Sequence, residues 1–351
     1  MNINTEEKKL ILEKLIEEDL KPYIKKIDAG EYYAESFIRK VLESGLLSSA
    51  NKSQQETLVT EFSVVEETAK TCMTTAFCIW CHLAALTYVR ETKNETLKQQ
   101  LLPKLEKGEI IGGTALSNPM KYYAGLEKLY LSAELTEGGY LISGVFPAVS
   151  NLGENHLFGI IAGVSESKQI MGIVSCNAEG LTLKEKADYL GANGSATYSC
   201  TFDKVFVSDE WILSENAASF AEQIRPAFIA YQIPLGLGVV QASIALIEKI
   251  SQRQNGCNRY LKTQACDLRT PAQELRKQFI NIFNSESINW KEIAEVRLKT
   301  AYLTLEAVQA NMLHHGSAGY LKDCEPSRKL REAYFYANLT PTIKHLEKIL
   351  Q

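Results

Sequence analysis

Two long stretches without a charged residue constrain the fold of this chain more than any other feature of its sequence. They cover residues 71–89 and 226–247, and each is roughly 20 residues long, the length of a membrane-spanning helix. The second stretch contains Gln232 and Gln241, whose amides lack partners in lipid but find them readily in a protein core. We therefore expect two central helices of a bundle, apolar on every side because neighbouring helices cover them, and no membrane span.

Charge and cysteine usage exclude several classes of function. The chain has 38 Lys and Arg against 42 Asp and Glu, a net charge of −4, which argues against a nucleic-acid partner because such proteins carry a basic excess. Acidic residues and lysines interrupt the apolar positions of residues 1–20, so we expect no secretory signal and a cytoplasmic protein. The eight cysteines are then expected to be reduced thiols.

One cysteine spacing matches a known cofactor motif. Cys78, Cys81 and His82 follow the pattern of covalent haem attachment. They lie within the first uncharged stretch, however, where we expect a buried helix, and a single pair of cysteines is too little for a zinc site. We interpret them as small buried side chains of a core helix and expect no metal.

The periodicity of apolar residues changes twice along the chain. Near the N-terminus it predicts a helix starting at Thr5 and further helices over 31–44, 54–71, 74–89 and 94–107. Toward the C-terminus it predicts helices over 225–250, 271–283, 289–315 and 326–337. Between them, alternation predicts six to eight antiparallel strands from Ile110 to Ser208, with a hairpin turn at Glu137-Gly138-Gly139. We expect the two helical parts to form one bundle with the β domain beside it.

Several segments agree in residues and order with one flavoprotein family. They are GGTALSNP at 112–119, GVFPAVSN at 144–151, the strand ending at Val207, GVVQ at 238–241, LHHGSAGY at 313–320 and LREA at 330–333. Together they resemble the acyl-CoA dehydrogenase family. The resemblance implies an α+β, mainly α fold, with an N-terminal helical domain at 1–109, a middle antiparallel β domain at 110–212 and a C-terminal helical bundle at 213–351.

The resemblance also implies a binding site for FAD. By the positions of the family motifs, the residues that would contact the dinucleotide are Leu116, Ser117, Ala148, Val149, Ser150, Arg253, Leu313 and Gly316. Serine hydroxyls suit this role because a flavin ring needs hydrogen-bonding groups around it. The relatives form dimers or tetramers in which FAD often spans two chains, so a homodimer or homotetramer is expected.

The catalytic residues depart from the family pattern. The family's dehydrogenases remove a substrate proton with a glutamate, and Thr340 occupies that position here. A threonine cannot accept a proton near neutral pH. Some members carry the glutamate on an earlier helix, where Glu222 is the nearest carboxylate, but a first-turn acid of this kind is also common for purely structural reasons.

These departures leave three functions open. The first is α,β-dehydrogenation of an acyl thioester, such as an acyl-CoA, with a relocated base. The second is an oxygen-using flavin monooxygenase of the same fold, for which His82, His314 or His315 could serve. The third is a homologue that has lost turnover, because fold and function can separate. The family's acyl-CoA-binding serine segment is replaced by Met-Lys-Tyr-Tyr at 120–123.

Overall fold

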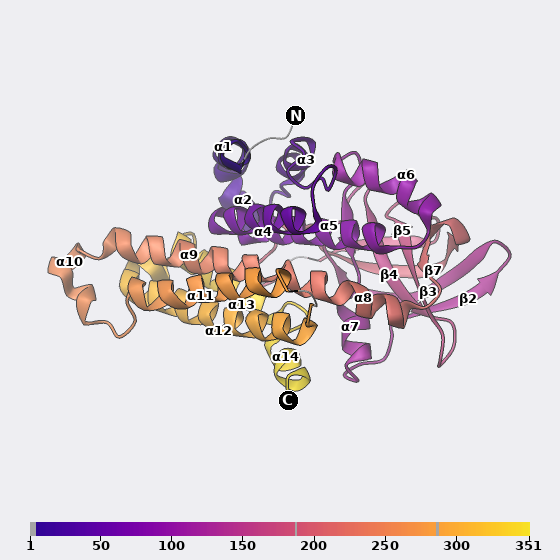
Figure 1. Cartoon of the computed structure of the whole chain (residues 1–351). Helices are drawn as coiled ribbons and strands as arrows, with labels where there is room; N and C mark the ends of the chain where they lie inside the picture. Colours follow the sequence, from indigo (N-terminus) through magenta and orange to yellow (C-terminus); the bar gives the residue numbers. More distant parts are fainter. Residues whose placement is uncertain (1–4, 187, 286–287) are drawn as a thin grey trace.

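The computed structural model describes residues 5–186, 188–285 and 288–351. Figure 1 shows helices, then a sheet, then helices again along the chain. The helices before the sheet are α1 (Thr5–Leu15), α2 (Ile24–Ala29), α3 (Glu35–Glu43), α4 (Gln54–Thr71), α5 (Met73–Glu91) and α6 (Glu95–Glu106). The helices after it are α8 (Ala217–Ala230), α9 (Ile233–Ile250), α10 (Arg253–Gly256), α11 (Ala265–Phe283), α12 (Trp290–His315), α13 (Glu325–Asn338) and α14 (Ile343–Ile349). This order confirms the predicted class, mainly helical with a β part in the middle.

Helices from both ends of the sequence share one core. In α9, a side chain on Gly238 would place its Cβ 2.6 Å from the Cβ of Ala69 in α4. A Cβ on Gly236 would lie 2.8 Å from atoms of Thr300 and Thr304 in α12. Glycines thus allow α9 to touch a helix from each part of the sequence, as the single-bundle prediction requires (Figure 1).

The two uncharged stretches are core helices of this bundle. Every residue of α5 from Met73 to Val89 is buried. Among the described residues, one helical stretch, Ala217–Ile250, is long and apolar enough to cross a membrane, and 67% of its most apolar window is buried inside the protein. The prediction of a single helix over 225–250 is wrong, because the chain turns between α8 and α9. Pro234 in the first turn of α9 has no amide hydrogen with which to continue a preceding helix.

In the described part of the chain, the sheet has eight strands with both antiparallel and parallel pairing. They are β1 (Gly112–Thr114), β2 (Leu131–Thr136), β3 (Gly139–Val149), β4 (Leu157–Gly163), β5 (Gln169–Ser175), β6 (Leu181–Glu185), β7 (Tyr198–Ser208) and β8 (Ile212–Ser214). Their order is β6-β7-β3-β2-β4-β5-β8, with β1 beside β4. The predicted hairpin joins β2 to β3. The antiparallel prediction holds except that β4 pairs in parallel with β1 and β2, because the chain crosses over before returning in the same direction.

Two helix starts differ from the sequence prediction. The helix α11 begins at Ala265, six residues before the predicted start at Pro271, which lies inside it. A reciprocal pair of hydrogen bonds between Gln264 and Asp267 caps this earlier start. The helix α3 begins at Glu35 rather than at residue 31. Pro271 and Glu31 are the start signals that led to the two predictions, but local capping and packing decide where each helix begins.

Candidate flavin and substrate site

The strand β1 is held directly against α5. The backbone N–H of Gly112 donates a hydrogen bond to Nδ1 of His82, at 3.0 Å. A Cβ on Gly112 would lie 2.3 Å from the Cβ of Ala85, so only glycine allows this approach. Burial lowers the pKa of His82 to about 3, which keeps the imidazole neutral and able to accept. His82 therefore positions β1 and the two predicted site residues after it, Leu116 and Ser117.

The end of β3 is held by a buried asparagine that sequence analysis did not single out as functional. The hydroxyl of Tyr33 donates to Oδ1 of Asn151 at 2.7 Å, and Nδ2 of Asn151 donates to the carbonyl of Gly112 at 2.8 Å. Its backbone N–H donates to the carbonyl of Ser195 at 2.9 Å. Asn151 has a positive φ of 64°, which asparagine tolerates better than most residues. It therefore connects β1, the end of β3 and the loop before β7.

A chain of hydroxyl groups determines how Ser150 can bind a ligand. Ser195 Oγ donates to the carbonyl of Ala192 at 2.6 Å, and it also lies 2.8 Å from Thr197 Oγ1. Thr197 Oγ1 in turn lies 2.7 Å from Ser150 Oγ. Because each hydroxyl has one hydrogen, Thr197 must donate to Ser195, and Ser150 must donate to Thr197. Ser150 therefore presents only lone pairs to its other neighbours and can accept a hydrogen bond from an N–H group.

The structure brings five of the predicted site residues to one end of the sheet. The position of a Cβ on Gly113 lies 3.1 Å from the carbonyl oxygen of Ser150, so β1 runs beside residues 148–150. Leu116 and Val149 are buried, Ala148 is exposed, and Ser117, the first residue of the short helix α7 (Ser117–Tyr123), is half-buried. Two half-buried serines on neighbouring segments can thus offer hydroxyl groups to one ligand.

The other three predicted cofactor residues lie at the opposite end of the molecule. Arg253 is exposed in α10, and the turn after α10 contacts the end of α12, because Asn258 Nδ2 donates to the carbonyl of His314 at 3.1 Å. Leu313, in the last turn of α12, is 68% exposed, and Gly316 follows it with a φ of 55°. Figure 1 shows α10 at the end of the bundle farthest from the sheet. Within one chain, these residues and Ser150 do not meet.

The histidines proposed for an oxygen-using enzyme do not line a common site. His82 is buried under β1. His314 Nε2 lies 2.9 Å from the carbonyl of Thr263, and His315 Nδ1 lies 2.9 Å from the carbonyl of Asn311. Both therefore bind backbone groups at the α10 end of the bundle, away from the two serines.

Thr340, which occupies the position of the family's catalytic base, is buried, and its backbone carbonyl accepts a hydrogen bond. Gln232 Nε2 donates to the carbonyl of Thr340 at 2.9 Å, and Gln232 Oε1 accepts from Nε of the buried Arg297 at 3.0 Å. These two hydrogen bonds give Gln232, in the second uncharged stretch, the buried partners that we expected from the sequence. Glu222, the alternative base, is exposed on α8, and no side chain of the described residues pairs with it.

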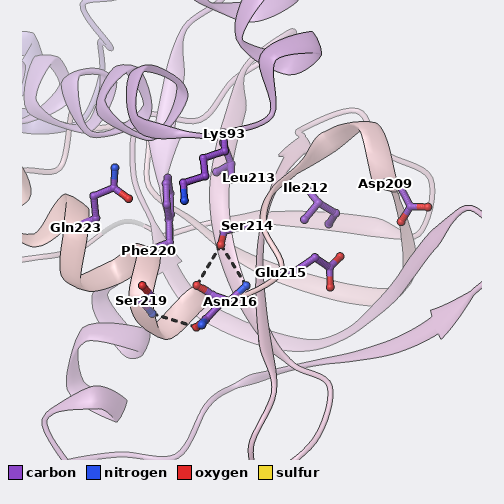
Figure 2. A pocket seen from close by; sticks show the side chains of 10 residues that line it. All are labelled: Lys93, Asp209, Ile212, Leu213, Ser214, Glu215, Asn216, Ser219, Phe220 and Gln223. Carbon is purple, nitrogen blue, oxygen red and sulfur yellow. Dashed lines mark hydrogen bonds between the residues drawn. The ribbon is translucent and has the colours of Figure 1, made fainter.

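A large cavity beside β8 contains none of the predicted site residues. It has a volume of about 550 Å³ and lies between Lys93, β8 and the start of α8; we call it the Lys93 cavity. Figure 2 shows the hydrogen bonds that join Ser214, Asn216 and Ser219 among its lining residues. Glu215 accepts from Tyr140 and pairs with Lys168 at 2.7 Å. Ser214, Asn216, Ser219 and Glu215 are thus already engaged in capping a helix and joining strands.

A smaller cavity adjoins the family's base position. It has a volume of about 200 Å³ and lies between α7, α8 and α14, with Trp290 on one wall; we call it the Trp290 cavity. Pro341, the residue after Thr340, lines it together with Phe228 and Ile229. Tyr123 and His345 also line it, and each has a buried polar atom without a hydrogen-bond partner. An apolar cavity with a few polar groups is the usual form of a small-molecule site.

Comparison with protein families identifies the N-terminal part of the chain. The family profile described as "Acyl-CoA dehydrogenase, N-terminal domain" matches residues 5–109. The mitochondrial isovaleryl-CoA dehydrogenase of Solanum tuberosum is 25% identical over 258 residues, which cover 68% of this chain and 61% of that enzyme. The chain thus aligns with less than two thirds of this relative's length.

Comparison with solved structures extends over nearly the whole chain. Butyryl-CoA dehydrogenase from Megasphaera elsdenii matches with a TM-score of 0.88 and 16% identity, covering 100% of this chain and 98% of that one. A glutaryl-CoA dehydrogenase from Mycobacterium smegmatis, solved in complex with FADH2, matches with a TM-score of 0.85 and 15% identity, covering 99% and 94%. At these identities the matches establish the fold, and they agree with the predicted order of helices, sheet and helices.

Proposed function

Because this chain belongs to the acyl-CoA dehydrogenase family, we propose that it is an FAD-dependent oxidoreductase that dehydrogenates an acyl thioester. The observation that carries the proposal is that Ser117 and Ser150 lie on neighbouring segments at one end of the sheet. These hydroxyls lie on neighbouring segments that are both held rigidly, one by His82 and the other by Asn151. Rigid hydrogen-bonding groups of this kind can orient a flavin ring.

The residues at the end of the sheet fit a flavin ring chemically. Ser150 offers lone pairs, so it suits an N–H group of the ring, while the hydroxyl of Ser117 makes no hydrogen bond within the described residues and can donate. The backbone of Leu116 and Val149 would lie beside the same ring. When bound, FAD supplies the acceptor for a hydride from the substrate. The chain's own residues orient the ring and exclude water around it.

The exposed end of the bundle supports assembly with a second copy. Arg253, Leu313 and Gly316 would hold the diphosphate part of FAD. They lie too far from the flavin-ring site of their own chain to hold the same FAD molecule with it. Large apolar side chains gather around these residues, namely Tyr260 (76% exposed), Leu313 (68%), Tyr320 (85%) and Leu321 (65%). Exposed apolar patches of this kind mark interaction sites. We propose a homodimer or homotetramer in which this end of one chain completes the cofactor site of another.

The Trp290 cavity is the proposed site of the acyl group. An engineered cavity of about 150 Å³ holds benzene, so a cavity of about 200 Å³ accommodates an acyl group of roughly six to eight non-hydrogen atoms. Such a volume favours short or branched acyl groups, such as those of small acyl-CoA substrates. Glu222 is less suited to act as the base, because its side chain does not line this cavity.

The absence of a carboxylate in this cavity supports a second candidate function. Among the described residues, neither an Asp nor a Glu lines the Trp290 cavity. A flavin monooxygenase of the same fold needs no carboxylate at this position, and a homologue without turnover needs no base at all. Both alternatives remain compatible with flavin binding at the sheet.

A spectrum of the purified protein tests the proposal. We expect flavin absorbance near about 450 nm and, without oxygen, bleaching by a panel of short acyl-CoA thioesters. Oxygen consumption with externally reduced flavin, and no bleaching, would favour the monooxygenase. Flavin that neither bleaches nor reacts with oxygen would favour the inactive homologue. A colourless protein that binds no added FAD would rule out both enzyme functions.

A further inference from the structure

The Trp290 cavity brings an unused histidine close to the family's base position. His345 lies in the first turn of α14, five residues after Thr340, and lines the cavity together with Pro341. The helices α7 and α14 are adjacent there, since Lys348 Nζ donates to the carbonyl of Ala124 at 3.1 Å; Figure 1 shows them on the same side of the bundle. Tertiary packing, not the motif itself, thus places a titratable group in this cavity.

His345 is the one side chain lining the cavity that can accept a proton at neutral pH. Of the ten lining residues, all described, only Tyr123, Arg225 and His345 titrate. Burial raises the pKa of Tyr123 to about 12, so its hydroxyl keeps its proton. The guanidinium of Arg225 has donor groups only and no acceptor, and it lies 4.8 Å from the centre of the Trp290 ring. The imidazole is therefore the only available base.

The surroundings of His345 keep its imidazole neutral, and its ring nitrogens have no hydrogen-bond partner among the described residues. The residue is 5% exposed, its Nδ1 is buried without a partner, and no described residue hydrogen-bonds to Nε2. Burial, with the positive charges of Lys121, Lys348 and Arg225, lowers the pKa of His345 to about 4; the opposing effect of Glu127 is smaller. Glu127 itself pairs with Lys121 at 2.9 Å. This pKa is close to that of an ordinary glutamate, about 4.3.

We propose that His345 is the catalytic base of this protein, an inference that rests on the proposed function. A ring nitrogen of His345 takes the proton from the α-carbon of a short acyl thioester. The electrons of the broken α C–H bond form the α,β double bond, and the β-hydrogen leaves with its electron pair to oxidised flavin, the oxidant. The substrate loses one proton and one hydride, and His345 carries the proton until it passes to solvent. Nearby positive charges stabilise the negative charge that develops on the thioester oxygen.

The test compares His345→Gln with Lys344→Gln, a control at the exposed neighbouring position on the same helix. Three quantities are measured with butyryl-CoA: the change in the tryptophan fluorescence of the protein on binding, exchange of the α-protons with deuterium oxide by NMR, and anaerobic flavin bleaching. For His345→Gln we expect binding within about threefold of wild type. Exchange and bleaching should fall at least about a hundredfold, the usual contribution of a general base. Lys344→Gln should match wild type in all three.

The outcomes separate this inference from the proposed function. Exchange and bleaching that persist in His345→Gln would overturn the role of His345 while leaving the dehydrogenase intact. Wild-type protein that neither exchanges nor bleaches would overturn the proposed function and this inference with it. If His345→Gln does not fold, His345→Asn is judged by the same measurements.

Discussion

The two ends of this molecule present their predicted cofactor residues in different ways. At the sheet end, Ser150 belongs to a buried network in which Asn151 and Thr197 hold it in place. At the α10 end, Arg253 and Leu313 are exposed, and the hydrogen bonds there join the segments around them rather than these two side chains. The first site is rigid within one chain, whereas the second has surface that another molecule can cover.

In the proposed function, one cofactor is held by these two kinds of surface. A reactive ring needs fixed neighbours, because small displacements of the reacting atoms cost much of the rate. A diphosphate needs mainly positive charge and backbone groups, which can come from a surface that is completed on assembly. Four experiments test this contrast between a rigid end and an exposed end, in order of decreasing effect.

The largest effect is expected where the rigid end depends on one side chain. Asn151→Ala removes one buried and one half-buried hydrogen bond, leaves the carbonyl of Gly112 without its side-chain partner and puts alanine at a positive φ. We expect the free energy of unfolding, measured with urea, to fall by about 4 kcal/mol. Asn258→Ala at the α10 end, which loses two half-buried bonds, to the carbonyls of Ile250 and His314, should cost about 1 to 2 kcal/mol. Equal losses would mean that the two ends are equally rigid.

The second effect is a pH dependence of the free energy of unfolding that arises from His82 at the sheet end. The folded pKa of His82, about 3, lies below the unfolded value of about 6.5. Its stabilising contribution is therefore complete above about pH 6.5 and is lost as the pH falls toward 3, because the unfolded chain takes up the proton first. Between about pH 7.5 and 4.5, wild type should lose about 3 kcal/mol more stability than His82→Gln. Parallel pH profiles would contradict a neutral buried imidazole.

The third effect concerns the exposed end and should leave stability unchanged. Arg253→Gln removes a charge that makes no ion pair with the described residues. We expect FAD to bind about tenfold more weakly, since a charge-assisted hydrogen bond to phosphate is lost. Thermal unfolding of the apoprotein should stay the same. Arg269→Gln, at an exposed position paired with Glu248, is the control; equal weakening by both variants would show a nonspecific charge effect.

The smallest effect is expected for a single neutral hydroxyl of the rigid end. Ser150→Ala should weaken FAD binding about fivefold, the equivalent of about 1 kcal/mol for one neutral hydrogen bond. Ser150→Thr keeps the hydroxyl and should bind like wild type. Titration of the apoprotein with FAD measures both. Unchanged binding of Ser150→Ala would show that the flavin ring does not contact this residue.

Much of the architecture could be predicted from local sequence patterns. The uncharged stretch 71–89 predicts a fully buried helix, and α5 is buried from Met73 to Val89. The glycines at 138 and 139 predict the hairpin of β2 and β3. These predictions succeed because burial and turn geometry leave periodic or compositional signals in a short window. The parallel pairing of β1 with β4 leaves no such signal, because it depends on where a distant segment returns.

Local sequence patterns were enough to establish the order of helices and strands, the family resemblance and the loss of a carboxylate at Thr340. Long-range packing was needed to bring Ser117 and Ser150 together while Arg253 lies at the other end of the bundle. The same packing places His345 in the cavity beside Pro341. A motif records local chemistry, whereas the contact between α14 and the end of α7 joins residues 224 positions apart in the sequence. Such contacts depend on how whole helices pack, and no short window of sequence contains that information.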